Sequence, residues 1–346
     1  MPVNLNFSFN FGVILLFILI SLLLTGFLSV IFYSNIIEYW FFNLISNSFN
    51  SFNYFFLRVL HNTFANLFFF FIYLHILKSW FYSSKNTFSV LLIGAIIFLL
   101  SCAIAFFGYC LPMGQMSFWA AIVIFSLLSV LPFGDTIILY LFGGFSISSR
   151  TITFLFLLHF LFPLLLTVFV IWHLYFLHSC LWSSSSDNLD LVFFFNYYLI
   201  IDIFIVFFFL FFTLIIVFFF SFLLFEWVNF WAFNSLVTPL HIYPDWFLLF
   251  PYACLRSIDS KVIGVLLLVF IIFCLFIIPI LTSYFNILPL NSYNYFLLFF
   301  FILLTFFGAN PSVYPYNVLV IFFQIVLYLI FFLICIYMFI FYKCYL

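Results

Sequence analysis

Four of the six histidines form two pairs with the same separation. His61 and His75 are fourteen residues apart, and so are His159 and His173. Fourteen residues of α-helix rise about 21 Å and turn through about 1400°, so both members of a pair lie close to one helix face. If the two helices run parallel, each of two levels offers a facing pair of imidazoles. Imidazole is a common metal ligand, and the spacing therefore indicates two metal-binding levels.

Four glycines repeat the same period. Gly12 and Gly26 are fourteen residues apart, as are Gly94 and Gly108. Neighbouring helices of opposite direction would bring Gly26 and Gly108 to the first histidine of each pair, and Gly12 and Gly94 to the second. A flat macrocycle needs close backbone approach, which glycine permits. The combined pattern favours two iron porphyrins with both axial positions filled by histidine, a ligation suited to electron transfer.

Other interpretations fit part of this pattern. Each histidine could be buried and satisfied by a hydrogen-bond partner, and the glycines could serve close helix packing. Neither explains the shared period. The main alternative function is a polytopic proton-coupled transporter with a relay of histidines and aspartates, and a third is a structural membrane subunit without a cofactor.

The composition is that of a membrane protein. The 346 residues are 70% hydrophobic and only 4% charged, with a mean hydropathy of +1.45. Many apolar runs exceed the roughly 20 residues that span a bilayer, and they are continuous blocks typical of helices, not alternating strands. A net charge of −1 excludes the broad basic surface of a nucleic-acid binder. The seven cysteines contain no CxxC motif, so we expect no disulfide framework or iron–sulfur site.

Apolar runs bounded by polar residues, Pro or Gly predict eight transmembrane helices. They lie at residues 11–33, 54–80, 88–109, 152–178, 199–225, 262–283, 295–308 and 318–342. The fold class is therefore all-α and polytopic. The first four helices should form a four-helix bundle around both histidine levels, giving a domain of residues 1–198, and residues 199–346 should form a second, C-terminal part.

Two long connections carry Pro, Gly and amphipathic stretches. They span residues 110–151 and 226–261, and we expect short surface helices in both. If the helices alternate in direction, both connections lie on one face of the membrane, here named side one. His178 and Asp202 fall on the opposite face, side two.

Several motifs resemble one known family over nearly the whole chain. They are "NFG" at 10–12, "GYCLPMGQMSFWAAIVI" at 108–124, "GGFS" at 143–146 and "HIYPDWFLLFPYACLRSI" at 241–258. With the histidine pairs, these residues resemble the mitochondrial cytochrome b family of respiratory complex III, the cytochrome bc complex. The eight spans favour the full-length respiratory form over the shorter plastid-type chain, whose second histidine pair is one residue wider.

The resemblance implies two heme b cofactors and two quinone sites. The low-potential heme would be held by His61 and His159, and the high-potential heme by His75 and His173. Quinol would be oxidised on side one and quinone reduced on side two, the arrangement of the Q cycle. The chain would be an enzyme subunit of ubiquinol:cytochrome c oxidoreductase, contributing to the proton gradient and active only in the complex.

Location and partners follow from the same resemblance. The family implies a multi-pass protein of the mitochondrial inner membrane. Nothing in the chain supplies the iron–sulfur acceptor for the second electron of quinol, so a Rieske iron–sulfur subunit and a cytochrome c-type subunit are implied. Other complex III subunits, a dimeric complex and lipids such as cardiolipin are implied as well.

The resemblance also assigns further site residues. Catalytic roles are implied for Asp245 and Tyr252 on side one and for His178 and Asp202 on side two. The quinol or inhibitor pocket would include Phe106, Tyr109, Ala120, Pro244 and Phe247. Arg58 and Lys78 would neutralise heme propionates, while the four glycines would admit the macrocycles.

The chain departs from the family at several of these positions. Asp245 stands where the family has Glu, Phe247 where it has Tyr, Met113 where it has Trp, and Ala120 where it has Gly. Lys78 and Phe154 replace arginines that pair with propionates. Lysine can still neutralise a propionate, although without bidentate geometry. At Phe154 the pairing is lost or supplied elsewhere, with Arg150 as a candidate.

Two of these departures lead to sharper hypotheses. Asp245 lies among Pro, Trp and Phe, where a carboxylate should have a raised pKa and so accept a proton from quinol. The alternative is that it caps a short helix beginning at Trp246. Ala120 adds a methyl group to the quinol pocket, and we expect native resistance to strobilurin-type inhibitors; ordinary Gly/Ala drift is the alternative.

Overall fold

A computed structural model describes residues 7–33, 37–82, 87–144, 146–179, 194–272 and 290–344. Nearly all regular structure in these ranges is helical, and β structure there is limited to one isolated bridge between Gly114 and Ala232. The N-terminal turn η1 (Phe7–Asn10) leads into the first long helix, and the turn η4 (Phe194–Tyr198) leads into α8.

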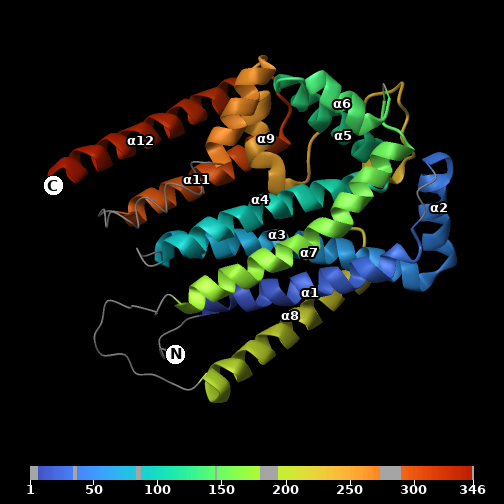
Figure 1. Cartoon of the computed structure of the whole chain (residues 1–346), viewed down its shortest axis with the longest axis horizontal. Helices are drawn as coiled ribbons and strands as arrows, with labels where there is room; N and C mark the ends of the chain where they lie inside the picture. The colour runs from blue at the N-terminus through green and yellow to red at the C-terminus, as the bar shows by residue number, and fades with distance from the viewer. Residues whose placement is uncertain are drawn as a thin grey trace.

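Six helices in the described ranges are long and apolar enough to cross a membrane. They are α1 (Phe11–Val30), α3 (Phe52–Tyr82), α4 (Phe88–Cys110), α7 (Ser149–Ser179), α8 (Leu199–Phe219) and α12 (Tyr316–Cys344). Their long axes run in broadly similar directions (Figure 1). The prediction of an all-α polytopic membrane protein is confirmed.

The predicted count of eight spans is not established. The apolar stretches at the sixth and seventh positions, Lys261–Ile272 and Tyr295–Ala309, are shorter than a full span. The second of them belongs to α11 (Leu290–Ala309). Residues 273–289, which include the end of the sixth predicted run, lie outside the described ranges. The count therefore stays a prediction.

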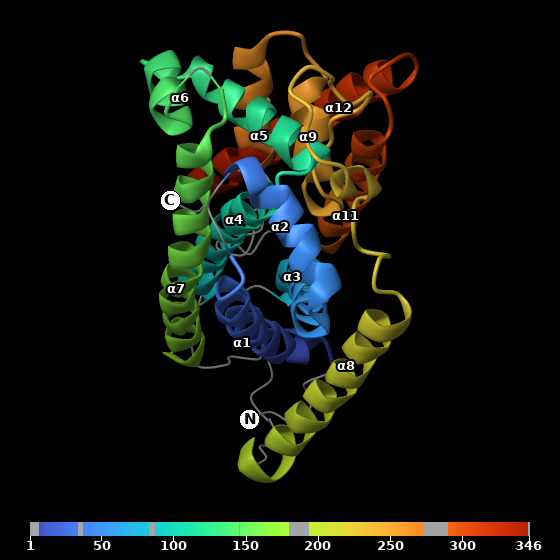
Figure 2. The same cartoon turned by 90° about the vertical axis from the view of Figure 1, so that its right-hand side faces the viewer.

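The helices α1, α3, α4 and α7 are grouped together, as the sequence predicts for its first four spans (Figure 2). The pairs in closest contact are α1 with α3 and α4 with α7. Buried apolar side chains from all four helices meet in one core, among them Ile18, Phe69, Ile97 and Leu166. Burial of such side chains holds the helix faces in register, which a site built from several helices requires.

One helix was not predicted. The segment between the first two spans forms α2 (Ile37–Asn50), which lies across the end of the bundle (Figure 1). Its sequence, IEYWFFNLISNSFN, mixes large apolar residues with Asn and Ser and is too short to span a bilayer. A surface helix of this kind has no long apolar run to mark it.

The two long connections form short helices at one end of the bundle, as predicted. The first contains α5 (Gln115–Leu127), η3 (Leu128–Val130) and α6 (Gly134–Phe142); the second contains η5 (Trp227–Phe230), η6 (Trp246–Leu248) and α9 (Leu249–Arg256). The Gln115 N–H donates to the Trp231 carbonyl at 2.9 Å. Asn229 Oδ1 accepts from the backbone N–H and the hydroxyl of Ser117, both at 3.0 Å. These bonds join the two connections at one end of the bundle, as predicted for side one.

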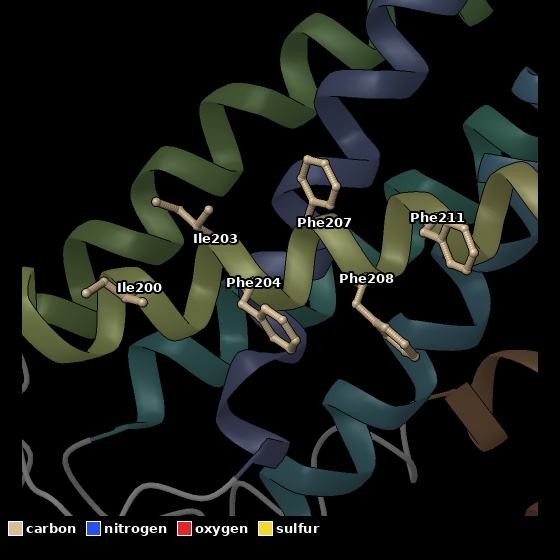
Figure 3. Close-up of a pocket in the computed structure, with 6 residues that line it drawn as sticks. All are labelled: Ile200, Ile203, Phe204, Phe207, Phe208 and Phe211. Carbon is tan, nitrogen blue, oxygen red and sulfur yellow. The ribbon is translucent and has the colours of Figure 1, made fainter.

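The outer face of α8 is strongly apolar. An open hollow of about 570 Å³ is lined by Ile200, Ile203, Phe204, Phe207, Phe208 and Phe211 (Figure 3). Phe204 and Phe207 are 71% and 72% exposed. Apolar exposure on this scale is unfavourable in water and expected of a helix that faces hydrocarbon.

Candidate functional site

The histidines of α3 and α7 face each other at two levels. The ring centroids of His61 and His159 are 6.1 Å apart, and those of His75 and His173 are 6.2 Å apart. The planes are inclined by 79° at the first level and by 61° at the second. The structure therefore brings together the pairs that the fourteen-residue spacing predicts.

Hydrogen bonds at the first level fix which ring nitrogen is free. His159 Nδ1 lies 2.9 Å from the Ile104 carbonyl oxygen, which can only accept, so Nδ1 carries the proton. His61 Nδ1 lies 2.9 Å from the Thr25 hydroxyl, whose own proton is directed to the Ser21 carbonyl at 2.8 Å. We infer that this hydroxyl accepts from Nδ1–H. Both Nε2 atoms then keep a lone pair for a metal, a common arrangement around metal-binding histidines.

The second level is less constrained. The buried Nδ1 atom of His75 makes no hydrogen bond among the described residues. His173 Nδ1 faces the Val90 carbonyl, although outside ordinary hydrogen-bond geometry. Buried polar atoms usually find a partner, so these rings are arranged less favourably than those of the first level.

Each of the four glycines lies against one of the four histidines. A Cβ placed on Gly26 or Gly94 would come 3.4 Å from Cε1 of His61 or His173. On Gly12 the distance to His75 Cε1 would be 3.6 Å, and on Gly108 the distance to His159 Cε1 would be only 2.4 Å. This pairing is the one predicted from the direction of the helices. A side chain at Gly108 would overlap the imidazole, so this position requires glycine.

The paired histidines fit an iron porphyrin. Metal–imidazole bonds of about 2 Å place two rings on opposite sides of one ion about 6 Å apart, close to the spacings found here. Within the described ranges, no group of three or more His, Cys, Asp or Glu is positioned to hold a bare metal ion. A two-histidine site needs a ligand that supplies the other coordination positions. A porphyrin does so, and the glycines leave room for its plane.

The cationic residues expected near the propionates have other contacts. Arg58 Nη1 donates to the Ser48 hydroxyl of α2 at 2.7 Å, and Lys78 Nζ lies 3.7 Å from the Phe9 ring centroid. Phe154 is 37% exposed and faces outward. The Arg150 guanidinium lies over the Tyr140 ring, 5.2 Å from its centroid, and within the described ranges no hydrogen bond joins it to a residue of either histidine level.

Asp245 is half-buried on side one, at the start of η6. Its side chain makes no capping hydrogen bond, so the alternative of a simple helix cap is wrong; only its backbone carbonyl accepts, from Leu248 N–H at 2.9 Å. Burial raises the pKa of Asp245 to about 7, and the negative charge of Glu226 acts in the same direction. A carboxyl group with such a pKa can exchange a proton near neutrality.

The residues around Asp245 are anchored to the histidine helix α3. Trp246 Nε1 donates to Asn66 Oδ1 at 2.8 Å, and the Tyr73 hydroxyl donates to the Phe247 carbonyl at 2.5 Å. The Tyr252 hydroxyl donates to the Ile242 carbonyl at 2.5 Å, which closes the loop on itself. The loop that carries the Asp245 carboxyl group is thus anchored to the same helix that carries His61.

The remaining side-one residues occupy different environments. Phe247 is buried and stacked on Phe69, with centroids 3.8 Å apart. Ala120 is on the buried face of α5, and Phe106 packs near Phe125 at 6.2 Å between centroids. Pro244 is half-buried beside Asp245.

Sequence reasoning missed Glu226, which lies within electrostatic reach of Asp245. Burial raises the pKa of Glu226, while the hydroxyls of Tyr243 and Tyr109 favour its ionised form. A lone carboxylate between Phe225 and Trp227, in a chain with 4% charged residues, was the available signal.

The two residues predicted for side two are placed differently. Asn10 Nδ2 donates to Asp202 Oδ1 at 2.5 Å, which ties the start of α8 to the start of α1. Asn10 belongs to the "NFG" motif and precedes Gly12. His178 is exposed near the end of α7, and in the described part of the chain no hydrogen bond joins it to Asp202.

Comparisons with known proteins agree with this geometry. Residues 1–181 match the family model described as cytochrome b/b6/petB, and residues 232–331 match that of cytochrome b(C-terminal)/b6/petD. The chain is 36% identical to "Cytochrome b" of Brachionus plicatilis over 330 residues, covering 91% of this chain and 86% of that protein. It is 39% identical to "Cytochrome b" of Apis mellifera ligustica over 329 residues, covering 91% and 85%.

A solved structure is similar as well. A chain of a hyperthermophilic respiratory complex III superposes with a TM-score of 0.88 at 26% identity, covering 98% of this chain and 93% of that chain. The matched segments include all four paired histidines and the loop that holds Asp245. By its sequence, by its fold and by the facing histidines of its bundle, this chain belongs to the cytochrome b family.

Proposed function

We propose that the chain is the di-heme b subunit of a quinol:cytochrome c oxidoreductase. The observation that carries this proposal is the pair of facing histidine levels, with centroids 6.1 and 6.2 Å apart and a glycine against every ring. Family membership supports heme b as the group they hold. The transporter alternative assigns no role to the glycines.

The residues have distinct tasks at the two levels. His61 and His159 would hold the low-potential heme, and His75 and His173 the high-potential heme. When bound, the two hemes supply one-electron transfer, so that electrons from quinol on side one reach quinone on side two. Thr25 and the Ile104 carbonyl hold the rings of the first level by their Nδ1 atoms.

On side one, Asp245 would take a proton from a bound quinol hydroxyl. Its raised pKa makes it a better proton acceptor than an ordinary aspartate, and Trp246 and Phe247 hold its loop against α3. Tyr252 and the pocket residues Phe106, Tyr109, Ala120 and Pro244 would position the quinol. Phe247 is buried by its stack on Phe69 and would shape the pocket from behind.

On side two, Asp202 and His178 would deliver protons to quinone. The Asn10 amide holds the Asp202 carboxylate and so fixes its direction. Arg58 and Lys78 are available to neutralise propionates after a change of rotamer away from Ser48 and Phe9. Both side chains are long and have many possible rotamers.

The activity requires partners. Quinol loses two electrons, and only one can enter the low-potential heme, so the other needs a separate one-electron acceptor. We infer a Rieske iron–sulfur subunit and a cytochrome c-type subunit, within a dimeric complex III that has further subunits and bound lipids such as cardiolipin. The location would be the mitochondrial inner membrane.

The experiment that tests this function uses the purified complex. Ubiquinol is added, and the reduction of b-type hemes and of cytochrome c is followed optically. We expect heme b absorbance to rise and cytochrome c to be reduced in a reaction that a quinol-site inhibitor blocks. Absence of b-type spectra, or hemes that quinol does not reduce, would contradict the proposal.

A further inference from the structure

Two carboxylates from different parts of the same connection lie within electrostatic reach of each other on side one. Glu226 precedes η5, and Asp245 precedes η6. The segment after Glu226 is pinned to α5 by the Ser117 and Asn229 bonds and by the Gln115 N–H. The segment around Asp245 is pinned to α3. The two backbone segments that carry the carboxylates are thus fixed by the fold.

Tyrosine hydroxyls surround Glu226. Its carboxylate faces the hydroxyls of Tyr243 and Tyr109. The Tyr109 hydroxyl, at the end of α4, is also within electrostatic reach of Asp245. This hydroxyl is buried, yet it makes no hydrogen bond of ordinary geometry to any described group. A buried donor between two carboxylates is the place where a water or a substrate hydroxyl completes a hydrogen-bond chain.

The position of Glu226 suits the transfer of a proton to solvent. Glu226 is half-buried, and its neighbour Trp227 is 72% exposed on side one. One side of the Asp245 environment is apolar, because the nearby Phe247 is buried there. The ionisable groups that face the pair are Tyr109 and Cys110 of α4 and Tyr243 of the loop. Within the described ranges no Lys, Arg or His is among them.

Electrostatics favours one proton shared by the two carboxylates. Burial raises the pKa of both groups, and their like charges oppose simultaneous ionisation. Such a pair takes up and releases protons in two coupled steps. The tyrosine hydroxyls stabilise the anion of Glu226, so Glu226 is the ionised member of the pair while Asp245 holds a proton, and it releases readily any proton it takes up.

We propose that Glu226 is a second proton-carrying residue of quinol oxidation, which accepts from Asp245 the proton that Asp245 takes from the quinol. The idea rests on the proposed function. A quinol O–H bond breaks as the Asp245 carboxyl O–H forms; that bond then breaks as an O–H forms on Glu226, and Asp245 returns to the carboxylate. Glu226 releases the proton to water on side one. No electron moves in these transfers.

The test compares Glu226→Gln, Glu226→Asp and Tyr243→Phe in the intact complex. The rate of quinol-driven heme b reduction is measured from about pH 5.5 to about pH 9, with heme spectra as a measure of assembly. Asp135→Asn, an exposed carboxylate of α6 near the same face, is the matched control and should behave as wild type.

We expect Glu226→Gln to lower the maximal rate about tenfold and to move the acidic limb of the profile about one unit to lower pH, because a like charge near Asp245 is removed. Glu226→Asp should recover most of the rate. Tyr243→Phe should slow the reaction less than Glu226→Gln. An unchanged rate and profile in Glu226→Gln would overturn the proposal. If that variant fails to assemble, an unchanged rate and profile in Tyr243→Phe would overturn it.

Failure of this inference and failure of the proposed function give different results. If wild-type hemes are not reduced by quinol, the proposed function is wrong. If quinol reduces them, and Asp245→Asn is slow while Glu226→Gln is not, Asp245 takes the proton but passes it elsewhere, and only the role of Glu226 is wrong.

Discussion

At the residue scale, the glycines differ in how closely they approach the histidines. A Cβ on Gly108 would lie 2.4 Å from His159 Cε1, whereas nothing lies within 4 Å of a Cβ on Gly144. We expect Gly108→Ala to lose roughly half or more of the low-potential heme, because the imidazole must move. The Gly144→Ala control should keep both hemes. Heme content and difference spectra of the purified variants measure this, and full occupancy in Gly108→Ala would refute the crowding argument.

The same scale gives a pH dependence for quinol oxidation. The pKa of Asp245 is raised to about 7, so its carboxylate fraction falls as the pH drops below 7 and grows above it. The rate of quinol oxidation should therefore decline toward acidic pH. Asp245→Asn should lower turnover about tenfold to a hundredfold, and the rate of the variant should no longer decline toward acidic pH. Quinol:cytochrome c turnover is the assay; full activity of the variant between about pH 6 and about pH 8 would exclude Asp245 as the proton acceptor.

Ala120 leads to a prediction about inhibitors. Its methyl group lies on the buried face of α5, where side chains are closely packed. If this face borders the quinol pocket, Ala120→Gly should bind strobilurin-type inhibitors about tenfold more tightly and oxidise quinol at a similar rate. Inhibitor titrations of the two proteins give the comparison. Equal sensitivity would show that the methyl group does not restrict the pocket.

Some residues could be assigned from the sequence and others could not. The histidine and glycine levels follow from the fixed rise and rotation of a helix, so spacing alone predicted their pairing. Glu226 depends on the path of an irregular loop, and its approach to Asp245 has no period that sequence could reveal. Arg58 turns to Ser48 of α2, a helix that the hydropathy pattern did not predict.

At the element scale, α3 and α7 fix the distance and the rotation between the two histidines that each of them carries. One extra residue shifts the following part of a helix by about 1.5 Å and about 100°. An alanine inserted in α7 between His159 and His173 should therefore separate the two levels and abolish one heme while the other is kept. An alanine inserted beside Gly144, in the loop before α7, is the control and should leave both. Retention of two hemes by the α7 insertion would contradict a shared helix face.

The side-one connections show which features of an element sequence can predict. Pro, Gly and amphipathic stretches predicted short helices, and α5, α6 and α9 confirm them. The cross-connection bonds, such as Asn229 to Ser117, arise only when residues far apart in the chain meet. The capping role considered for Asp245 is wrong, because its side chain makes no capping hydrogen bond.

At the scale of the whole molecule, the two histidine levels are stacked between side one and side two inside the helix bundle. The outer surface of the molecule is apolar, as expected of a protein surrounded by lipid. The outward Phe and Ile side chains of α8 need hydrocarbon or other subunits around them (Figure 3). The exterior therefore requires a membrane, and the match to a chain of a respiratory complex III indicates that the chain works with other subunits of that complex.

The central claim is that one chain holds two hemes between paired histidines. Potentiometric titration of the purified complex, followed by b-type absorbance, tests it most directly. We expect two one-electron transitions of similar amplitude at distinct potentials, with His61→Leu removing one and His75→Leu the other. A single transition, no b-type absorbance, or two transitions that survive both substitutions would contradict the account.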